Sequence, residues 1–284
     1  MKLEGIFVPL VTPFAADGSI AIDALHDLAH QVIDDGAAGI VALGTTAEAA
    51  TLDAAERRQV VDLCAKVCQE REVPLVVGAG SNDTQATRAA LAELGPNVSA
   101  ALVPVPSYTR PGERGVVAHF RHLNSPVPVL IYHVPPRTAQ PLSSAALLEI
   151  AVLPYVVGIK LATGVLDQQA IDLLGVPDFA VLAGDDFLLS ALLALGAQGG
   201  ITASAHLVTR RFAGLWTAWQ RGDVMHARTL GHELARLAGA AFVEPNPTVI
   251  KGALHALGRI PTAQVRLPLL PASEAAVQSM LSTM

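Results

Sequence analysis

The run Val156-Val157-Gly158-Ile159-Lys160 sets the pattern from which the fold follows, because it is apolar up to its closing lysine. A strand that is buried on both faces reads in this continuous way, as is typical of parallel sheets covered by helices. Seven further runs of this kind lie along the chain, at 6–10, 39–43, 75–77, 100–103, 129–132, 180–183 and 200–202.

Amphipathic stretches of helical period separate these runs, at 22–35, 54–69, 84–94, 113–123, 144–150, 166–174 and 186–195. This repeated alternation of strand and helix predicts an α/β fold of the TIM (β/α)8 barrel class. From His206 onward the pattern is helical only, at 207–220, 224–241, 247–257 and in a tail after Ser273. We therefore expect a (β/α)8 barrel over residues 1–205 and a C-terminal helical extension over residues 206–284.

The composition indicates one large globular core. Of the 284 residues, 51% are hydrophobic and 15% are charged, which argues against disorder. The length also suits this barrel class, which typically needs about 250 residues. The formal net charge is −6, and no run of lysine or arginine is present to neutralise phosphates, so we expect no nucleic-acid partner.

Membrane, metal and disulfide signals are weak in this sequence. The stretch 187–209 has no charged residue, but Gly196 and residues 198–200 interrupt it, so a buried helix, a glycine turn and a buried strand explain it better than a membrane span. Cys64 and Cys68 lack the further Cys or His ligands of a metal site, and we expect both to be reduced thiols. We therefore expect a cytoplasmic protein with no membrane contact, no metal ion and no cofactor.

Lys160 is the first candidate catalytic residue, because it closes an apolar strand whose end would lie at the catalytic face of a barrel. A buried ammonium is costly unless it is paired or neutral, and a neutral amine can attack a carbonyl group. Two structural alternatives stand beside this interpretation: the lysine could reach solvent at the strand terminus, or pair with Asp185 or Asp186.

The fifth strand is followed by two further candidates. Tyr132 at its end could carry protons, or it could be a half-buried packing tyrosine. Arg137 follows in Pro135-Pro136-Arg137, a loop stiffened by prolines, where it could hold a carboxylate with both guanidinium nitrogens or simply lie on the surface.

The second strand leads into Gly44-Thr45-Thr46-Ala47-Glu48. The hydroxyls of Thr45 and Thr46, with adjacent backbone N–H groups, could bind a small carboxylate, although an ordinary turn entering a helix would look similar. Because these candidates fall on the ends of strands two, five and six, we expect them to share one site.

At these residues the chain resembles the dihydrodipicolinate synthase / N-acetylneuraminate lyase family of Schiff-base class I aldolases. The resemblance runs nearly end to end, and the ordered set of motifs is specific to the superfamily. The matching stretches are Thr12-Pro13-Phe14, Gly44–Glu48, Tyr132–Pro135, Gly158-Ile159-Lys160, Gly184-Asp185-Asp186 and Phe242-Val243-Glu244-Pro245-Asn246-Pro247 leading to Lys251.

The resemblance implies a role for each matching residue. Lys160 would form the Schiff base with pyruvate, and Tyr132 would relay protons through a hydroxyl chain with Thr45. Thr45 and Thr46 would hold the pyruvate carboxylate, and Ile201 is expected among the substrate-binding residues. Tyr108 matches the tyrosine that family members insert into a neighbouring subunit's site, so the resemblance also implies a homotetramer built as a dimer of dimers.

The acceptor aldehyde is the harder question. In the synthase branch an arginine at the place of Arg137 grips the carboxylate of aspartate semialdehyde, and the stretches 242–251 and 265–268 also look most like that branch. This favours condensation of pyruvate with aspartate semialdehyde in lysine biosynthesis. The first alternative is an aldolase or dehydratase acting on a 2-keto-3-deoxy sugar acid or N-acetylneuraminate. The second is a catalytically silent barrel that binds a small acid.

Four residues depart from the family pattern. Ala47 replaces a glycine, which adds a methyl group and restricts the backbone, and His133 stands where synthases commonly have asparagine. Ser107 and Ala86 replace residues that belong to the effector pocket of lysine-inhibited members. We therefore expect little feedback inhibition by lysine.

Overall fold

The computed structural model describes residues 3–284, and its centre is a closed barrel of eight parallel strands. The strands pair in chain order, and the eighth returns to pair with the first. The predicted (β/α)8 barrel is therefore confirmed. The strands are β1 Gly5–Pro9, β2 Gly39–Ala42, β3 Leu75–Gly78, β4 Ala100–Pro104, β5 Val129–His133, β6 Val156–Leu161, β7 Ala180–Ala183 and β8 Gly199–Ile201.

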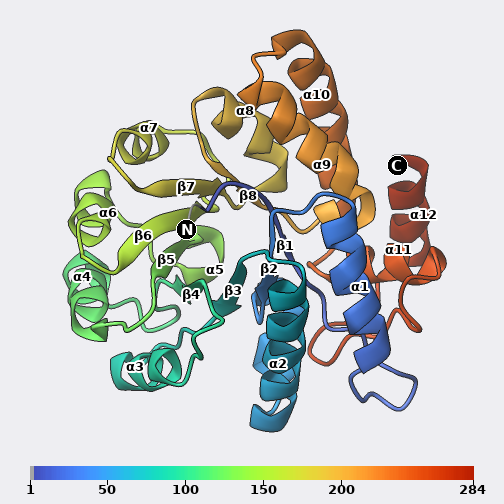
Figure 1. Cartoon of the computed structure of the whole chain (residues 1–284), viewed down its shortest axis with the longest axis horizontal. Helices are drawn as coiled ribbons and strands as arrows, with labels where there is room; N and C mark the ends of the chain where they lie inside the picture. Colours follow the sequence, from blue (N-terminus) through green and yellow to red (C-terminus); the bar gives the residue numbers. More distant parts are fainter. Residues whose placement is uncertain (1–2) are drawn as a thin grey trace.

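Helices surround the barrel on all sides (Figure 1). Those in the ring are α1 Ile22–Asp34, α2 Ala54–Glu70, α3 Thr84–Ala92, α4 Gly112–Leu123, α6 Ser144–Ala151, α7 Gln168–Leu174, α8 Leu189–Ala194 and α9 Ala205–Gln220. Shorter turns lie between strand and helix: η1 Thr45–Ala47, η2 Ala49–Thr51, α5 Pro135–Thr138 and η3 Asp186–Leu188.

Two layers of apolar side chains form the core, because successive residues of a strand point to opposite faces of the sheet. One face of each strand packs against the helices. The other face fills the barrel interior, where a Cβ atom on Gly39 would come within 2.6 Å of the Phe7 ring. Glycine at that position therefore makes room for the phenylalanine. The interior cluster contains Phe7, Val41, Val76, Ala100, Leu102, Leu130, Tyr132, Leu182 and Ile201.

Capping side chains set several helix boundaries. Helix α2 begins after Asp53, which accepts from the backbone N–H of Glu56 while Glu56 accepts from the backbone of Asp53. The stretch 166–174 was expected to be helical throughout. Helix α7 instead begins at Gln168, because the Asp167 side chain accepts from the N–H groups at the helix start.

The uncharged stretch 187–209 resolves into the elements that the sequence predicts. It comprises the end of η3, helix α8, a turn at Gly196, strand β8 and the first turn of α9. Within residues 3–284, no helix has the length and apolar character that crossing a membrane requires.

Both cysteines are free and buried on α2, as expected for reduced thiols. Burial raises the pKa of the Cys68 thiol to about 12 and raises the pKa of Cys64 further. The two groups are therefore protonated at neutral pH and are not nucleophiles.

Three helices follow the ring: α10 Val224–Ala241, α11 Thr248–Ala256 and α12 Glu274–Ser282. In Figure 1 they occupy one side of the barrel, coloured orange to red, and α12 packs against both α10 and α11. Helix α9 packs against β1 and so belongs to the ring as well as to the helical C-terminal part. The division into residues 1–205 and 206–284 stays a prediction.

Candidate active site

A cavity of about 170 Å³ opens where the carboxyl ends of the strands meet. Residues from the ends of five strands (β2, β5, β6, β7 and β8) or the turns that follow them, and from the C-terminal part, line it. They are Thr45, Thr46, Tyr132, Val134, Pro136, Arg137, Lys160, Ala162, Gly184, Asp185, Asp186, Ile201, Ala203, Phe242 and Asn246. Six of the seven residues proposed from the sequence are in this lining, and Tyr108 is the exception.

Lys160 and Tyr132 lie side by side in the barrel. They are register partners in the pairing of β5 with β6, so both side chains point to the same face of the sheet. Both are buried, and the Lys160 Nζ lies 4.5 Å from the centroid of the Tyr132 ring. An amine and a phenol are thus brought together beside a cavity that admits a small molecule.

Two carboxyl groups after β7 share this cavity with Lys160. Burial raises the pKa of Asp185 and of Asp186, while the charge of Lys160 acts in the opposite direction on both. Asp186 accepts from the backbone N–H groups of Ala203 and Ser204, at 3.2 and 2.6 Å, and from the Ser204 hydroxyl. Within residues 3–284 no ion pair joins Lys160 to either carboxyl group, so the structural pairing considered for this lysine is not present.

The turn after β2 is bracketed by two residues in the left-handed region, Leu43 and Glu48, each with φ of 54°. Non-glycine residues rarely adopt this conformation, and such strain concentrates at functional sites. Between them, Thr46 is buried and its hydroxyl accepts from the Asn246 amide at 2.9 Å. Thr45 is exposed and lines the cavity, but no hydrogen bond joins it to Tyr132 in the described part of the chain.

Ala47 does not strain this turn. It is buried within η1, its carbonyl oxygen accepts from the Thr12 hydroxyl at 2.7 Å, and its φ is not positive. The expected restriction of the backbone therefore has no effect here, because the left-handed position that favours glycine falls one residue later, at Glu48.

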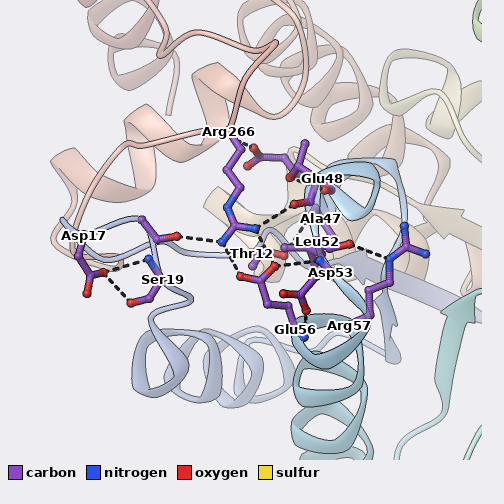
Figure 2. Close-up of polar contacts among 12 residues, drawn as sticks. Thr12, Asp17, Ser19, Ala47, Glu48, Leu52, Asp53, Glu56, Arg57 and Arg266 are labelled. Carbon is purple, nitrogen blue, oxygen red and sulfur yellow. Dashed lines mark hydrogen bonds and ion pairs between the residues drawn. The ribbon is translucent and has the colours of Figure 1, made fainter.

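Glu48 also forms a buried ion pair that sequence reasoning did not predict. One carboxylate oxygen accepts from the Lys251 Nζ at 2.7 Å, and the other accepts from the backbone N–H of Arg266 at 2.8 Å. Figure 2 shows Arg266 between two glutamates. Its backbone N–H donates to Glu48, and its guanidinium group forms an ion pair with Glu56. The sequence offered one signal for this pair: both residues belong to the stretches that match the family, Glu48 at the end of Gly44–Glu48 and Lys251 after Phe242–Pro247.

Arg137 reaches the cavity from the turn after β5, and Ile201 reaches it from the end of β8, three strands further around the barrel. Arg137 was expected on a proline-stiffened loop and instead lies in α5, a single helical turn that begins with two prolines and suits their fixed φ. Its side chain is exposed and lines the cavity, where it can meet an anion. Ile201 ends β8 and is buried in the cavity wall.

Tyr108 lies away from the cavity, with 90% of its surface exposed and φ of 61°. Arg110 is also left-handed, so the loop between β4 and α4 holds the tyrosine out in an unusual backbone conformation. The neighbouring Ser107 is fixed to Asn82, whose side-chain oxygen accepts from both the backbone N–H and the hydroxyl of Ser107.

Two buried histidines stay neutral. Burial lowers the pKa of His133 and of His206 to about 4. The His206 Nε2 accepts from the Val11 N–H at 3.1 Å, while neither ring nitrogen of His133 has a hydrogen-bond partner within residues 3–284. His133 points away from the cavity that its neighbour Tyr132 lines.

Comparison with known proteins places this geometry in a family. The profile of the Dihydrodipicolinate synthetase family matches residues 2–284. The chain belongs to this family. It is 38% identical over 279 residues to a 4-hydroxy-tetrahydrodipicolinate synthase of Thermodesulfovibrio yellowstonii, covering 95% of this chain and 94% of the relative. It is 36% identical to that of Neisseria meningitidis, covering 96% and 94%.

Solved structures agree with the sequence relatives. A dihydrodipicolinate synthase from Bacillus anthracis superposes with a TM-score of 0.93 at 31% identity, covering 100% of this chain and 98% of that chain. A chloride-inhibited dihydrodipicolinate synthase from Acinetobacter baumannii, complexed with pyruvate, gives a TM-score of 0.93 at 32% identity, covering 99% and 98%. The predicted membership of this family is confirmed, and these relatives support the synthase branch rather than the sugar-acid alternative.

Proposed function

We propose that this protein catalyses the 4-hydroxy-tetrahydrodipicolinate synthase reaction, which joins pyruvate to L-aspartate 4-semialdehyde on the route to diaminopimelate and lysine. The observation that carries the proposal is the pairing of Lys160 with Tyr132 in a cavity also lined by Thr45, Thr46 and Arg137. A protein complexed with pyruvate is among the solved relatives, which supports the choice of first substrate.

Pyruvate binds first, with its carboxylate on the Thr45–Thr46 turn and its ketone facing the Lys160 amine. The amine adds to the carbonyl carbon, and the carbinolamine loses water to give an imine, with Tyr132 moving protons to and from the oxygen. Loss of a proton from the methyl group of the bound pyruvate then gives an enamine, which is a carbon nucleophile. Lys160 and Tyr132 are the residues that form it.

The enamine attacks the aldehyde carbon of the second substrate, whose carboxylate is positioned by Arg137. The aldehyde oxygen takes up a proton and becomes the 4-hydroxyl group. The substrate's own amine then adds to the imine carbon, and the Lys160 amine departs as the ring closes. Each turnover therefore releases one water and restores the free lysine.

Assembly is part of the proposal. Tyr108 extends from a loop held in a left-handed conformation and is almost fully exposed, as a residue shared with a neighbouring site would be in an isolated chain. We infer a cytoplasmic homotetramer in which this tyrosine reaches a partner's cavity. We also expect weak inhibition by lysine, because Ser107 and Ala86 replace the residues that form the effector pocket in lysine-inhibited members.

Borohydride trapping and a coupled turnover assay test the proposal together. The chain has four lysines, Lys2, Lys66, Lys160 and Lys251, so peptide mapping of the pyruvate adduct gives an unambiguous answer. We expect the adduct on Lys160. Lys160→Ala should abolish it, while Lys66→Ala, at an exposed position on α2, is the matched control and should keep it.

Turnover of pyruvate with L-aspartate semialdehyde is measured by coupling the product to its NADPH-dependent reductase. Robust turnover supports the proposed acceptor. An adduct on Lys160 without turnover would keep the aldolase chemistry and reject this aldehyde, and an adduct elsewhere would reject the assignment of the lysine.

A further inference from the structure

The turn that carries Thr45 and Thr46 is held from the far end of the chain. Asn246 donates to the Thr46 hydroxyl, Lys251 donates to Glu48, and the backbone N–H of Arg266 donates to the other oxygen of Glu48. The residues that these contacts join are 200, 203 and 218 positions apart in the sequence. The turn is therefore shaped by the C-terminal helical part as much as by the strand that precedes it.

Glu48 is the residue at which the turn changes direction. It is the C-cap of η1 and the N-cap of η2, and its φ of 54° places a side chain with a Cβ in the left-handed region. A residue stays in this conformation only when its surroundings hold it there. Both carboxylate oxygens of Glu48 are engaged by partners from the C-terminal part, which supplies that restraint.

The pair with Lys251 is completely removed from water. The side chains of Glu48 and Lys251 are 1% and 0% exposed, and the Lys251 Nζ also lies 4.1 Å from the centroid of the Phe14 ring. A buried ion pair gains little stability over an apolar pair of the same volume, because desolvation opposes the attraction. Fixed geometry is the property that such a pair supplies and an apolar pair does not.

Neither residue lines the cavity, so any effect on the reaction passes through the turn between them and the substrate. Figure 2 shows Glu48 beside Ala47, whose carbonyl oxygen is bound by Thr12 on the barrel side. The three consecutive residues Thr46, Ala47 and Glu48 are thus each anchored by a different contact. The backbone N–H groups of this turn have little freedom left.

We propose that Glu48 and Lys251 are a positioning pair, which fixes the Thr45–Thr46 turn in the orientation that binds the carboxylate of pyruvate. This inference rests on the proposed function, because it takes the turn to be the carboxylate site. The pair acts on the first substrate and not on the second, whose carboxylate is assigned to Arg137 on the other side of the cavity.

The test uses the full-length protein with the variants Glu48→Gln/Lys251→Met and Glu48→Gln. The double variant removes both charges at nearly constant volume and leaves no unpaired buried ion. The single variant is the harsher change, because it leaves the Lys251 ammonium buried without its counter-charge and gives one acceptor oxygen to the two donors, Lys251 Nζ and the Arg266 N–H. A matched control, Arg211→Met/Glu233→Gln, removes an ion pair of 2.7 Å between α9 and α10 that does not touch the turn.

The measurements are the pyruvate concentration that gives half-maximal borohydride trapping, the two KM values, kcat and the thermal midpoint. In the double variant we expect half-saturation by pyruvate to rise about tenfold or more, with kcat and the KM of the aldehyde within about threefold of wild type. The single variant should move half-saturation the same way by at least as large a factor, and its thermal midpoint should fall further. In the control, the pyruvate concentration for half-maximal trapping should equal that of wild type, even if the thermal midpoint of the control is lower.

Each outcome has one meaning. If wild type traps pyruvate on Lys160 and neither variant changes its half-saturation, the positioning pair is wrong and the proposed function stands. If the control weakens pyruvate binding as much as the variants do, the effect is general destabilisation, and the inference is overturned as well. If wild type traps no pyruvate on Lys160, the proposed function itself fails.

Discussion

Mild acid is expected to destabilise this protein through His133 and His206. Both side chains are fully buried, and burial lowers the pKa of each to about 4 from the ordinary value of 6.5. His206 has a further reason to stay neutral, because a proton on its Nε2 would face the Val11 N–H that now donates to it. Protonating either ring therefore favours the unfolded chain.

The magnitude follows from the difference in proton binding. At pH 7.5 and above both rings are almost entirely neutral in the folded and the unfolded state and contribute almost no pH dependence. As the pH falls below 6.5 the unfolded chain binds protons that the folded chain does not, so the free energy of unfolding decreases. With a folded-state pKa of about 4, each ring costs about 2 kcal/mol at pH 5 and about 3 kcal/mol at pH 4.

Two carboxyl groups act in the opposite direction. Burial raises the pKa of Asp185 and of Asp186, so the folded state binds protons that the unfolded state does not when the pH falls toward 4. The total pH dependence is therefore a balance, and the difference between wild type and a histidine variant is the quantity that isolates one ring.

His133→Leu is the informative variant, because this ring has no hydrogen-bond partner within residues 3–284 to lose. Urea unfolding followed by circular dichroism at pH 7.5 and pH 5.0 gives the free energy at each pH. We expect the loss between the two pH values to be about 2 kcal/mol smaller in the variant than in wild type. An equal loss in both proteins would refute the argument, and His226→Leu, at an exposed position, is the control.

Three further predictions concern single side chains. Tyr132→Phe should lower turnover by about 10²–10⁴ if the phenol relays protons, measured in the coupled assay; an unchanged rate would leave it a packing residue. Arg137→Ala should raise the KM of the aldehyde while borohydride trapping of pyruvate stays near wild type, and weaker trapping would contradict the division of carboxylate sites. Arg266→Gln should reduce the free energy of unfolding at pH 7 by about 2 kcal/mol, because it leaves Glu56, whose pKa the guanidinium group lowers to about 2, without its partner. Urea unfolding measures this loss, and a change below a few tenths of a kcal/mol would contradict it.

The sequence was sufficient for the barrel because each strand is a local signal. Each of the eight continuous apolar runs corresponds to one strand, and no predicted end differs from the observed end by more than one residue. The errors lie where tertiary contacts or caps decide a boundary. Residues 186–195 were expected as one helix and form η3 followed by α8, with Asp186 turned into the core to bind Ser204.

The candidate site shows the same division between local and distant signals. Lys160, Tyr132, Thr46 and Arg137 were found from the strand or turn that carries each one, and the structure brings them around one cavity. Their catalytic roles stay predictions. The pairing of Glu48 with Lys251 was out of reach, because neither local pattern specifies a partner 203 positions away.

The contacts that bind the Thr45–Glu48 turn to residues 246–266 also have a kinetic consequence. Each closes a loop of about two hundred residues. Contacts of such sequence separation form slowly, because the chain loses the entropy of the open loop before the contact contributes any favourable energy. Most neighbouring strands of the barrel pair across far shorter stretches of chain, but the pairing of β1 with β8, which closes the barrel, joins Gly5 to Gly199 across 194 positions. We therefore expect the carboxylate turn and the seam between β1 and β8 to form late together, so that a folding intermediate with an open barrel would lack both.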